Sequence, residues 1–339
     1  MPQSGTTAEL QERTLASAQK DLPGKTNRNA SRRLEADHKS TRVMSARSSL
    51  AAWTIFALAA GAAAQTYVLM PDSTNNRLVA FDPFDGSVVN GNLFALAGGT
   101  PLNAMQVGSE IWVSEQVGDR VSRWDLAGNS LGAISGALDN IRGMELFNGV
   151  VYVSNGGAAN GAPGASLRMF DTSGNSLGHF TTPQVSSPFD VLAFQGDLLV
   201  ANSSANDDIH RYTTAGSSGG TFHNSTSLNF VEQMDFALNG NVLAAGFSSN
   251  NIVWLDPTTG AITQSVTASG ARGVFQLGNG NILWSNGSGA WVFDAATGGS
   301  TLVYSGGGRF FDTYVVPEPA TLIALGVALA SLAARRRTR

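Results

Sequence analysis

The sequence contains no cysteine among its 339 residues, which excludes disulfides, thiolate metal sites and cysteine nucleophiles. It also contains no lysine between Gln65 and Pro319, where eight arginines stand against twenty Asp and Glu residues. This segment therefore carries a net charge of about −12. Because an acidic surface repels phosphate backbones, we set nucleic acid aside as a partner.

Histidine is scarce and serine lacks the usual catalytic context. His179, His210 and His223 show no spacing typical of metal ligands. The segment around Ser288 lacks the Gly-x-Ser-x-Gly pattern, and no amphipathic helix follows it. Neither a histidine metal site nor serine catalysis is predicted.

Long hydrophobic runs are few, and the first lies near the N-terminus. Residues 1–43 are polar and lack hydrophobic periodicity, so we predict a disordered leader without a fold and take Met44 as the actual start. Residues 44–64 have a signal-peptide layout: Arg47, a short apolar core, and the small residues Ala62 and Ala64. Signal peptidase is expected to cleave between Ala64 and Gln65. The alternative is an extended N-terminal region ahead of an uncleaved anchor.

The second hydrophobic run lies at the C-terminus, residues 317–339. It follows a Pro-Glu-Pro motif and runs from Ala320 to Ala334. About fifteen apolar residues give a helix of about 22 Å, which predicts a short transmembrane segment. Cationic side chains after it are expected to stop transfer on the cytoplasmic side. The residues of this signal are Pro317, Glu318, Pro319, Arg335, Arg336 and Arg337.

This three-part end resembles the PEP-CTERM sorting signal. The resemblance implies recognition by exosortase, a membrane enzyme, and removal of the helix near Pro317-Glu318-Pro319. It further implies export, transient or permanent anchoring in the inner membrane, and a cell-surface or extracellular destination. The family is tied to bacteria that produce exopolysaccharide. The alternative is an ordinary C-terminal anchor with a chance Pro-Glu-Pro.

The body, residues 65–316, repeats with a period near 43, which is typical of propellers and solenoids. A β-rich hexad marks each repeat, and a glycine two to four residues later predicts a hairpin turn with positive φ. An apolar strand precedes each hexad, and a further strand precedes five of those. The hexads occupy residues 77–82, 120–125, 166–171, 208–213, 251–256 and 289–294.

The sixth such strand, 312–316, comes after the last repeat. A chain that begins with three strands of a blade and ends with the missing one closes a ring by pairing its ends. We therefore predict an all-β fold, a six-bladed β-propeller closed by the C-terminal strand. A β-solenoid is the structural alternative. The motif arrangement resembles NHL-type and gluconolactonase-type propellers.

One polar position recurs at the start of each innermost strand and is expected to face the mouth of the central channel. Three interpretations are open: a structural ring of salt bridges, a binding funnel, or a catalytic metal site. The resemblance to gluconolactonases implies Ca²⁺ held by Asp190, Glu232 and Asp312, but the two arginines depart from that pattern. No cofactor is predicted otherwise. The six residues are Asn103, Arg142, Asp190, Glu232, Arg272 and Asp312.

A second polar rim follows the next strand of each repeat. Asn and Asp are common turn residues, so turn chemistry is favoured over a ligand here. Its members are Asp72, Glu115, Asn155, Asn202, Gly246 and Asn286.

Two functions from different classes follow. The first is a binding or matrix-associated protein with no catalysis, whose partners are exopolysaccharide or surface proteins. The second is a metal-dependent, lactonase-like hydrolase that uses the channel carboxylates. A quinone-dependent propeller ranks last, because no residue set specifies a quinone.

Overall fold

The computed structural model describes residues 64–204 and 208–316. The leader, the signal peptide with Ala62, and the C-terminal signal with Pro317, Glu318, Pro319 and its arginines lie outside the described residues. Within these two ranges no helix is long and apolar enough to cross a membrane.

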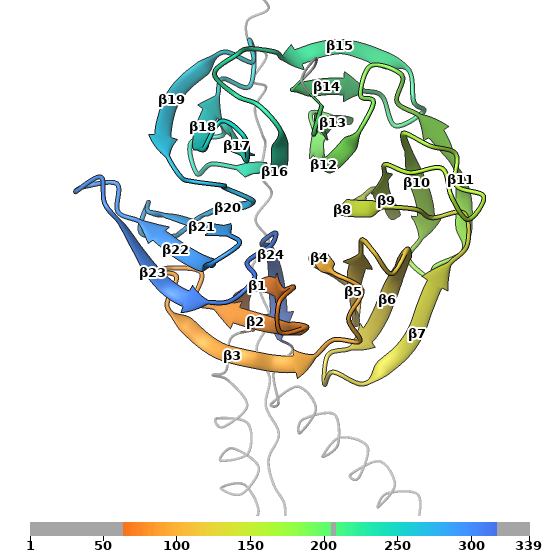
Figure 1. Cartoon of the computed structure of the whole chain (residues 1–339), viewed down its shortest axis with the longest axis horizontal. Coiled ribbons are helices and arrows are strands. Elements are labelled where there is room, and N and C mark those ends of the chain that lie inside the picture. The colour runs from red at the N-terminus through yellow and green to blue at the C-terminus, as the bar shows by residue number, and fades with distance from the viewer. Residues whose placement is uncertain (1–63, 205–207, 317–339) are drawn as a thin grey trace, which may run out of the picture. The chain divides into compact units, whose positions relative to one another are not determined.

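Six four-stranded antiparallel sheets stand around a central axis (Figure 1). All regular structure in the described ranges is β-strand, as predicted. The predicted six-bladed propeller is confirmed. Five blades take their four strands in chain order, and the sixth combines β24 with β1, β2 and β3.

Each blade has an innermost strand beside the channel, then a second, a third and an outer strand. The innermost strands are β4 (Pro101–Val107), β8 (Ile141–Phe147), β12 (Pro188–Phe194), β16 (Val231–Phe236), β20 (Gly273–Gln276) and β24 (Asp312–Val316). The second strands are β1 (Gln65–Asp72), β5 (Glu110–Glu115), β9 (Val150–Asn155), β13 (Asp197–Asn202), β17 (Val242–Gly246) and β21 (Ile282–Asn286).

The third strands coincide with the hexads, and the outer strands follow the glycine turns. The third strands are β2 (Arg77–Phe81), β6 (Arg120–Asp125), β10 (Ser166–Asp171), β14 (Ile209–Tyr212), β18 (Asn251–Leu255) and β22 (Gly289–Phe293). The outer strands are β3 (Val88–Ala95), β7 (Ser130–Ser135), β11 (Ser176–Thr181), β15 (Ser218–His223), β19 (Ile262–Thr267) and β23 (Ser300–Ser305).

The turn between the third and outer strands explains why five of the six hexads end in Asp. In β10, the Asp171 carboxylate accepts backbone N–H bonds from Ser173 at 2.9 Å and Asn175 at 2.8 Å. Gly174 in the same turn has φ of 91°, a conformation that costs glycine nothing. The repeated Asp and Gly therefore build the hairpins. The glycines with positive φ at this place are Gly86, Gly128, Gly174, Gly216, Gly260 and Gly298.

The ring closes where β24 pairs with β1. The register runs from Gln65 opposite Val316 to Leu69 opposite Asp312. Tyr314 is buried and stacks on Tyr67, with ring centroids 6.5 Å apart. The predicted closure by the C-terminal strand is confirmed.

The innermost strands all run from one mouth of the channel to the other, which gives the ring two different faces. At their ends, the Gln106 side chain of β4 hydrogen-bonds the Val315 backbone of β24. Because Gln65 pairs with Val316, the body begins and ends on this face. We call it the proximal face, and the face where the innermost strands begin the distal face.

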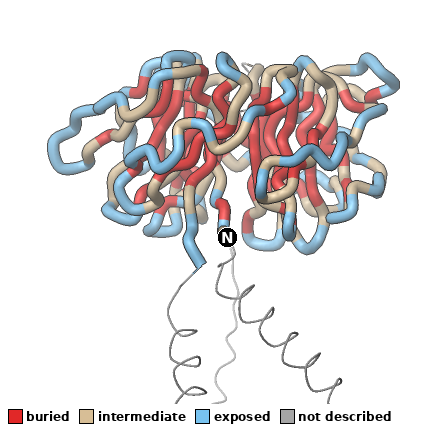
Figure 2. The backbone as a smooth tube through the Cα atoms, turned by 90° about the horizontal axis from the view of Figure 1, so that it is seen from below, coloured by how far each residue is buried: buried red, intermediate tan, exposed pale blue. Residues whose placement is uncertain are grey.

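The core lies between adjacent blades and is built mainly from the second and third strands. These strands are buried, whereas the outer strands are largely exposed (Figure 2). Sheets covered on both sides lose the alternation of apolar and polar residues, as in β17, where every residue is buried. The packed blades hold the innermost strands in place around the channel.

Candidate functional site

The six predicted channel residues lie at different depths along the channel. A one-residue bulge near the start of β8 separates Ile141, opposite Asn155, from Met144, opposite Val153. Similar bulges occur in β4, β12 and β16, whereas no bulge interrupts the β20 pairing with β21. A bulge shifts the following side chains along the strand but changes the repeat length little. Aligning the repeats in the sequence therefore could not predict the depth at which each side chain lies in the channel.

A middle level of polar side chains joins the innermost strands to one another. The Met144 N–H donates to Asn103 Oδ1 at 3.0 Å, and the Met234 N–H donates to Asp190 Oδ2 at 2.8 Å. Gln233, which the sequence did not single out, repeats the arrangement by accepting from the Val274 N–H at 2.9 Å. Since the channel edge of each innermost strand has no further strand to pair with, these bonds satisfy backbone groups. Asn103 and Asp190 therefore have a structural role.

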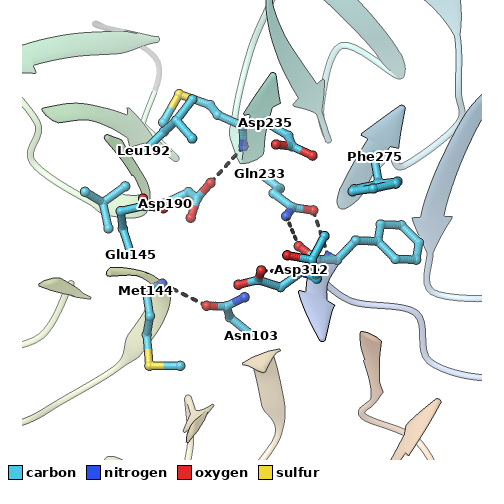
Figure 3. Close-up of a pocket in the computed structure, with 13 residues that line it drawn as sticks. Asn103, Met144, Glu145, Asp190, Leu192, Gln233, Asp235, Phe275 and Asp312 are labelled. Carbon is cyan, nitrogen blue, oxygen red and sulfur yellow. Dashed lines mark hydrogen bonds between the residues drawn. The ribbon is translucent and has the colours of Figure 1, made fainter. Parts of the chain in front are cut away.

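Four carboxyl groups, one of them Asp190 of this middle level, gather in the channel around a cavity of about 110 Å³ (Figure 3). Asp190 and Asp312 were predicted channel residues. Glu145 and Asp235 were missed, although an acidic residue inside an apolar innermost strand was an available signal. The cavity therefore has an acidic lining, to which Asn103 and Gln233 add amides.

These carboxyl groups are shifted toward the protonated form. Burial raises the pKa of Asp235 and of Asp312 to about 7. Burial also raises the pKa of Glu145 well above its usual range, and the charges of Asp312, Asp190 and Asp235 add to it. The pKa of Asp190 is raised by burial as well. The cluster can therefore take up and release protons near neutral pH.

The carboxylates suggested for Ca²⁺ do not come together as a set. Asp190 and Asp312 line the acidic cavity, but Glu232 belongs to a different group of side chains. In the described parts of the chain, no three Asp, Glu or His side chains form a group suited to holding a metal ion.

The distal mouth is lined by three arginines and by phenylalanines. Arg142 Nη1 donates to Ser187 Oγ and to the Pro188 carbonyl, both at 2.9 Å. Its guanidinium lies 4.5 Å from the centre of the Phe189 ring. This arginine is therefore fixed on an aromatic surface at the start of β12.

The other two arginines lie just before the innermost strands β20 and β24. Arg272 lies 5.5 Å from the centre of the Phe247 ring. Arg309 Nε donates to Ser73 Oγ at 2.9 Å. Arg309 was missed because it precedes β24, outside the six aligned positions.

Glu232 is the acid that faces these arginines. Burial raises its pKa to about 7, although the charges of Arg272, Arg309 and Arg142 pull it downward. Among the described residues, no ion pair within 4.0 Å joins Glu232 to an arginine. The ion pairs that these residues do form lie away from the innermost strands. The ring of salt bridges, one of the three interpretations left open by the sequence, is therefore not formed among the described residues. Arg142 and Arg272 stack on phenylalanines, and Arg142 and Arg309 bond to hydroxyl or carbonyl oxygens.

The second polar rim forms turns, as favoured from the sequence. Its members are the last residues of the second strands. Asp72 accepts the Thr74 N–H at 3.0 Å and the Tyr304 hydroxyl at 2.6 Å. Burial raises the pKa of Asp72, but hydrogen bonds from Asn75, Tyr304 and Gly307 outweigh it and lower the pKa to about 2.

Comparison with known proteins identifies the C-terminal signal. Residues 315–337 match the model of the PEP-CTERM protein-sorting motif. No curated protein matches the sequence. The chain thus carries a PEP-CTERM motif, which implies export by way of exosortase with membrane anchoring and then surface display.

Solved structures resemble the body in fold. A protein of unknown function from Bacteroides caccae aligns with 14% identity and a TM-score of 0.56, covering 73% of this chain and 98% of that one. The nidogen/laminin complex gives 10% identity and a TM-score of 0.62, covering 74% and 98%. A streptogramin B lyase gives 13% identity and a TM-score of 0.49, covering 75% and 89%. At identities of 14% and 10%, the likeness to the first two structures is one of fold alone.

Proposed function

We propose that this protein is a non-catalytic binding protein, delivered to the cell surface or extracellular matrix and engaging its partner through the distal mouth of the propeller. Signal peptidase and exosortase are its processing enzymes in this proposal. Its binding partners are exopolysaccharide or other surface components. The PEP-CTERM motif supports the delivery, and the distal mouth supports the binding.

The position of the arginines relative to the chain ends carries this proposal. The chain enters at Gln65 and leaves at Val316 on the proximal face. Arg142, Arg272 and Arg309 lie at the opposite mouth, where the innermost strands begin. A tether attached at Val316 would therefore leave the arginine-lined mouth turned away from the anchor and open to partners.

The hydrolase alternative has less support from the same geometry. It requires several carboxylate oxygens to converge on one ion. Glu232, one of the three residues proposed for that role, faces three arginines instead. The four channel carboxyls that do gather have raised pKa values, and neutral carboxyl groups are poor ligands for a hard cation.

Retention of the protein by its own cells tests the binding role. The host would carry wild type, Arg272→Gln or Arg211→Gln at the native locus. Arg211, on the third strand β14, is a matched control because it also stacks on a phenylalanine but is paired with Asp197 of β13. We expect equal export of all three and a several-fold larger fraction of Arg272→Gln in the medium. Equal retention of all three would refute binding through the distal mouth.

A further inference from the structure

We infer that the distal mouth binds a hydroxylated carboxylate of the uronic-acid type, with its carboxylate on the arginines and a hydroxyl donated to Glu232. This inference rests on the proposed binding function and adds the chemical class of the ligand. Four observations carry it: unused donors, unbalanced positive charge, an unused acceptor, and an aromatic wall.

The arginines have donors that the protein does not use. Arg142 is only 7% exposed, yet its Nε has no hydrogen-bond partner. Arg272 Nε is also buried without a partner. A buried donor without an acceptor is costly. A ligand with acceptor oxygens would satisfy both groups, and guanidinium suits the two oxygens of a carboxylate.

The positive charge at this mouth is not balanced by the protein. Burial lowers the pKa of Arg142 to about 10. Burial, followed by the charge of Arg272, lowers the pKa of Arg309 to about 10. These groups stay cationic at neutral pH, and the single acid facing them, Glu232, makes no ion pair with them in the described ranges. The mouth therefore attracts an anion even though the body as a whole is acidic.

Glu232 makes the site selective among anions. Its Oε2 atom is buried without a partner. A bare anion would leave this acceptor unsatisfied. It would also be repelled by the ionised form of Glu232, whose pKa burial raises to about 7. A hydroxyl next to the carboxylate of the ligand would donate to Glu232 while the carboxylate contacts the arginines. This favours hydroxy acids over acetate or inorganic phosphate.

The phenylalanines supply a wall for the body of such a ligand. The ring centroids of Phe189 and Phe230 are 5.3 Å apart, and those of Phe230 and Phe247 are 5.1 Å apart. Phe230 and Phe247 are half-buried, so part of their surface is accessible. A pyranose ring has an apolar C–H face that packs on such a surface. The combination fits a sugar acid.

Calorimetric titration of the full-length chain in detergent, without phosphate, tests this site. The probes are D-galacturonate, D-galactose, acetate and inorganic phosphate. We expect galacturonate to bind at least tenfold more tightly than the other three. Arg272→Gln should weaken the binding of galacturonate at least tenfold, since it removes a charged donor group. Arg211→Gln should leave this affinity unchanged.

A second variant checks the role assigned to Glu232. Glu232→Gln removes the repelling charge and the strong acceptor, so acetate should bind more tightly and the preference for galacturonate over acetate should shrink. A titration with polygalacturonate distinguishes two sources of the ligand. Equal affinity per uronate indicates a free or terminal sugar acid, whereas tighter binding indicates a polysaccharide chain.

Three outcomes would overturn the inference: acetate or phosphate binding as tightly as galacturonate, no effect of Arg272→Gln, or no binding of galacturonate. If galacturonate fails to bind while Arg272→Gln still escapes from cells into the medium, the proposed binding function survives and only the ligand class is wrong.

Discussion

Asp312 illustrates how single residues in the channel differ from those on the surface. It begins β24, lines the acidic cavity with Glu145, Asp190 and Asp235, and accepts a hydrogen bond from the Thr313 N–H at 2.6 Å. Burial raises its pKa to about 7, whereas an unfolded aspartate has a pKa of about 4. The folded chain therefore holds a proton here that the unfolded chain has already lost.

Replacing Asp312 by Asn should stabilise the protein at high pH. A folded pKa above the unfolded one gives stability that is present below about pH 4 and is lost as the pH rises through about 7. Asn keeps the acceptor and cannot ionise. We expect Asp312→Asn to match wild type near pH 4 and to exceed it at pH 8 by about 1–2 kcal/mol, a value reduced from the full shift because the side chain is half-buried.

Urea unfolding at both pH values measures this difference, and Asp85→Asn is the control. Asp85 is exposed, and its pKa is lowered by the Ser87 backbone hydrogen bond, so this variant should gain no stability as the pH rises. Equal gains for both variants would show that net charge, and not the channel, sets the effect.

The residue types in the channel could be predicted from the sequence, but not their depth. Asn103, Arg142, Asp190, Glu232, Arg272 and Asp312 were found because polar residues stood out in apolar strands. Their sorting into a distal mouth and an acidic cavity depends on bulges in four innermost strands. A bulge depends on backbone geometry that spans neighbouring strands, which the repeat pattern does not record.

At the scale of elements, the hexads and their glycines made the third strands and the turns predictable. Each hexad contains an aromatic residue, five of the six also contain β-branched residues, and a turn signal follows. The structure places a third strand at every one. The ring closure was predictable because β24 supplies the sixth innermost strand, which the first repeat lacks. Its register, with Thr66 opposite Val315, required the structure.

A disulfide across β1 and β24 should stabilise the closed ring. The Val315 backbone groups bond to the Gln106 side chain, so Thr66 and Val315 form a non-hydrogen-bonded pair, with Cα atoms about 4.5 Å apart in such pairs. That spacing suits a disulfide. Thr66→Cys with Val315→Cys should raise the free energy of unfolding by about 3–5 kcal/mol when oxidised.

Unfolding of the double variant with and without reductant measures this gain. The chain has no native cysteine to compete, and each single variant is a control for the substitutions themselves. Failure of the two thiols to join in the folded protein would contradict the register of the closing strands.

At the scale of the whole molecule, the two faces of the ring have different roles. The proximal face carries both ends of the described body, Gln65 and Val316. The distal face carries the arginines and phenylalanines. The repeat length and the sorting motif could be predicted from the sequence. The placement of the arginines opposite the chain ends required the structure, because it follows from the common direction of the innermost strands.

The intact mass of the mature protein, recovered from its native host in membrane and released fractions, tests the processing at both ends together. We predict a chain that begins at Gln65 and ends near Pro317-Glu318-Pro319, together with any group that exosortase processing adds. A mass that retains residues 320–339 in every fraction would contradict exosortase processing and leave a propeller with a permanent C-terminal anchor.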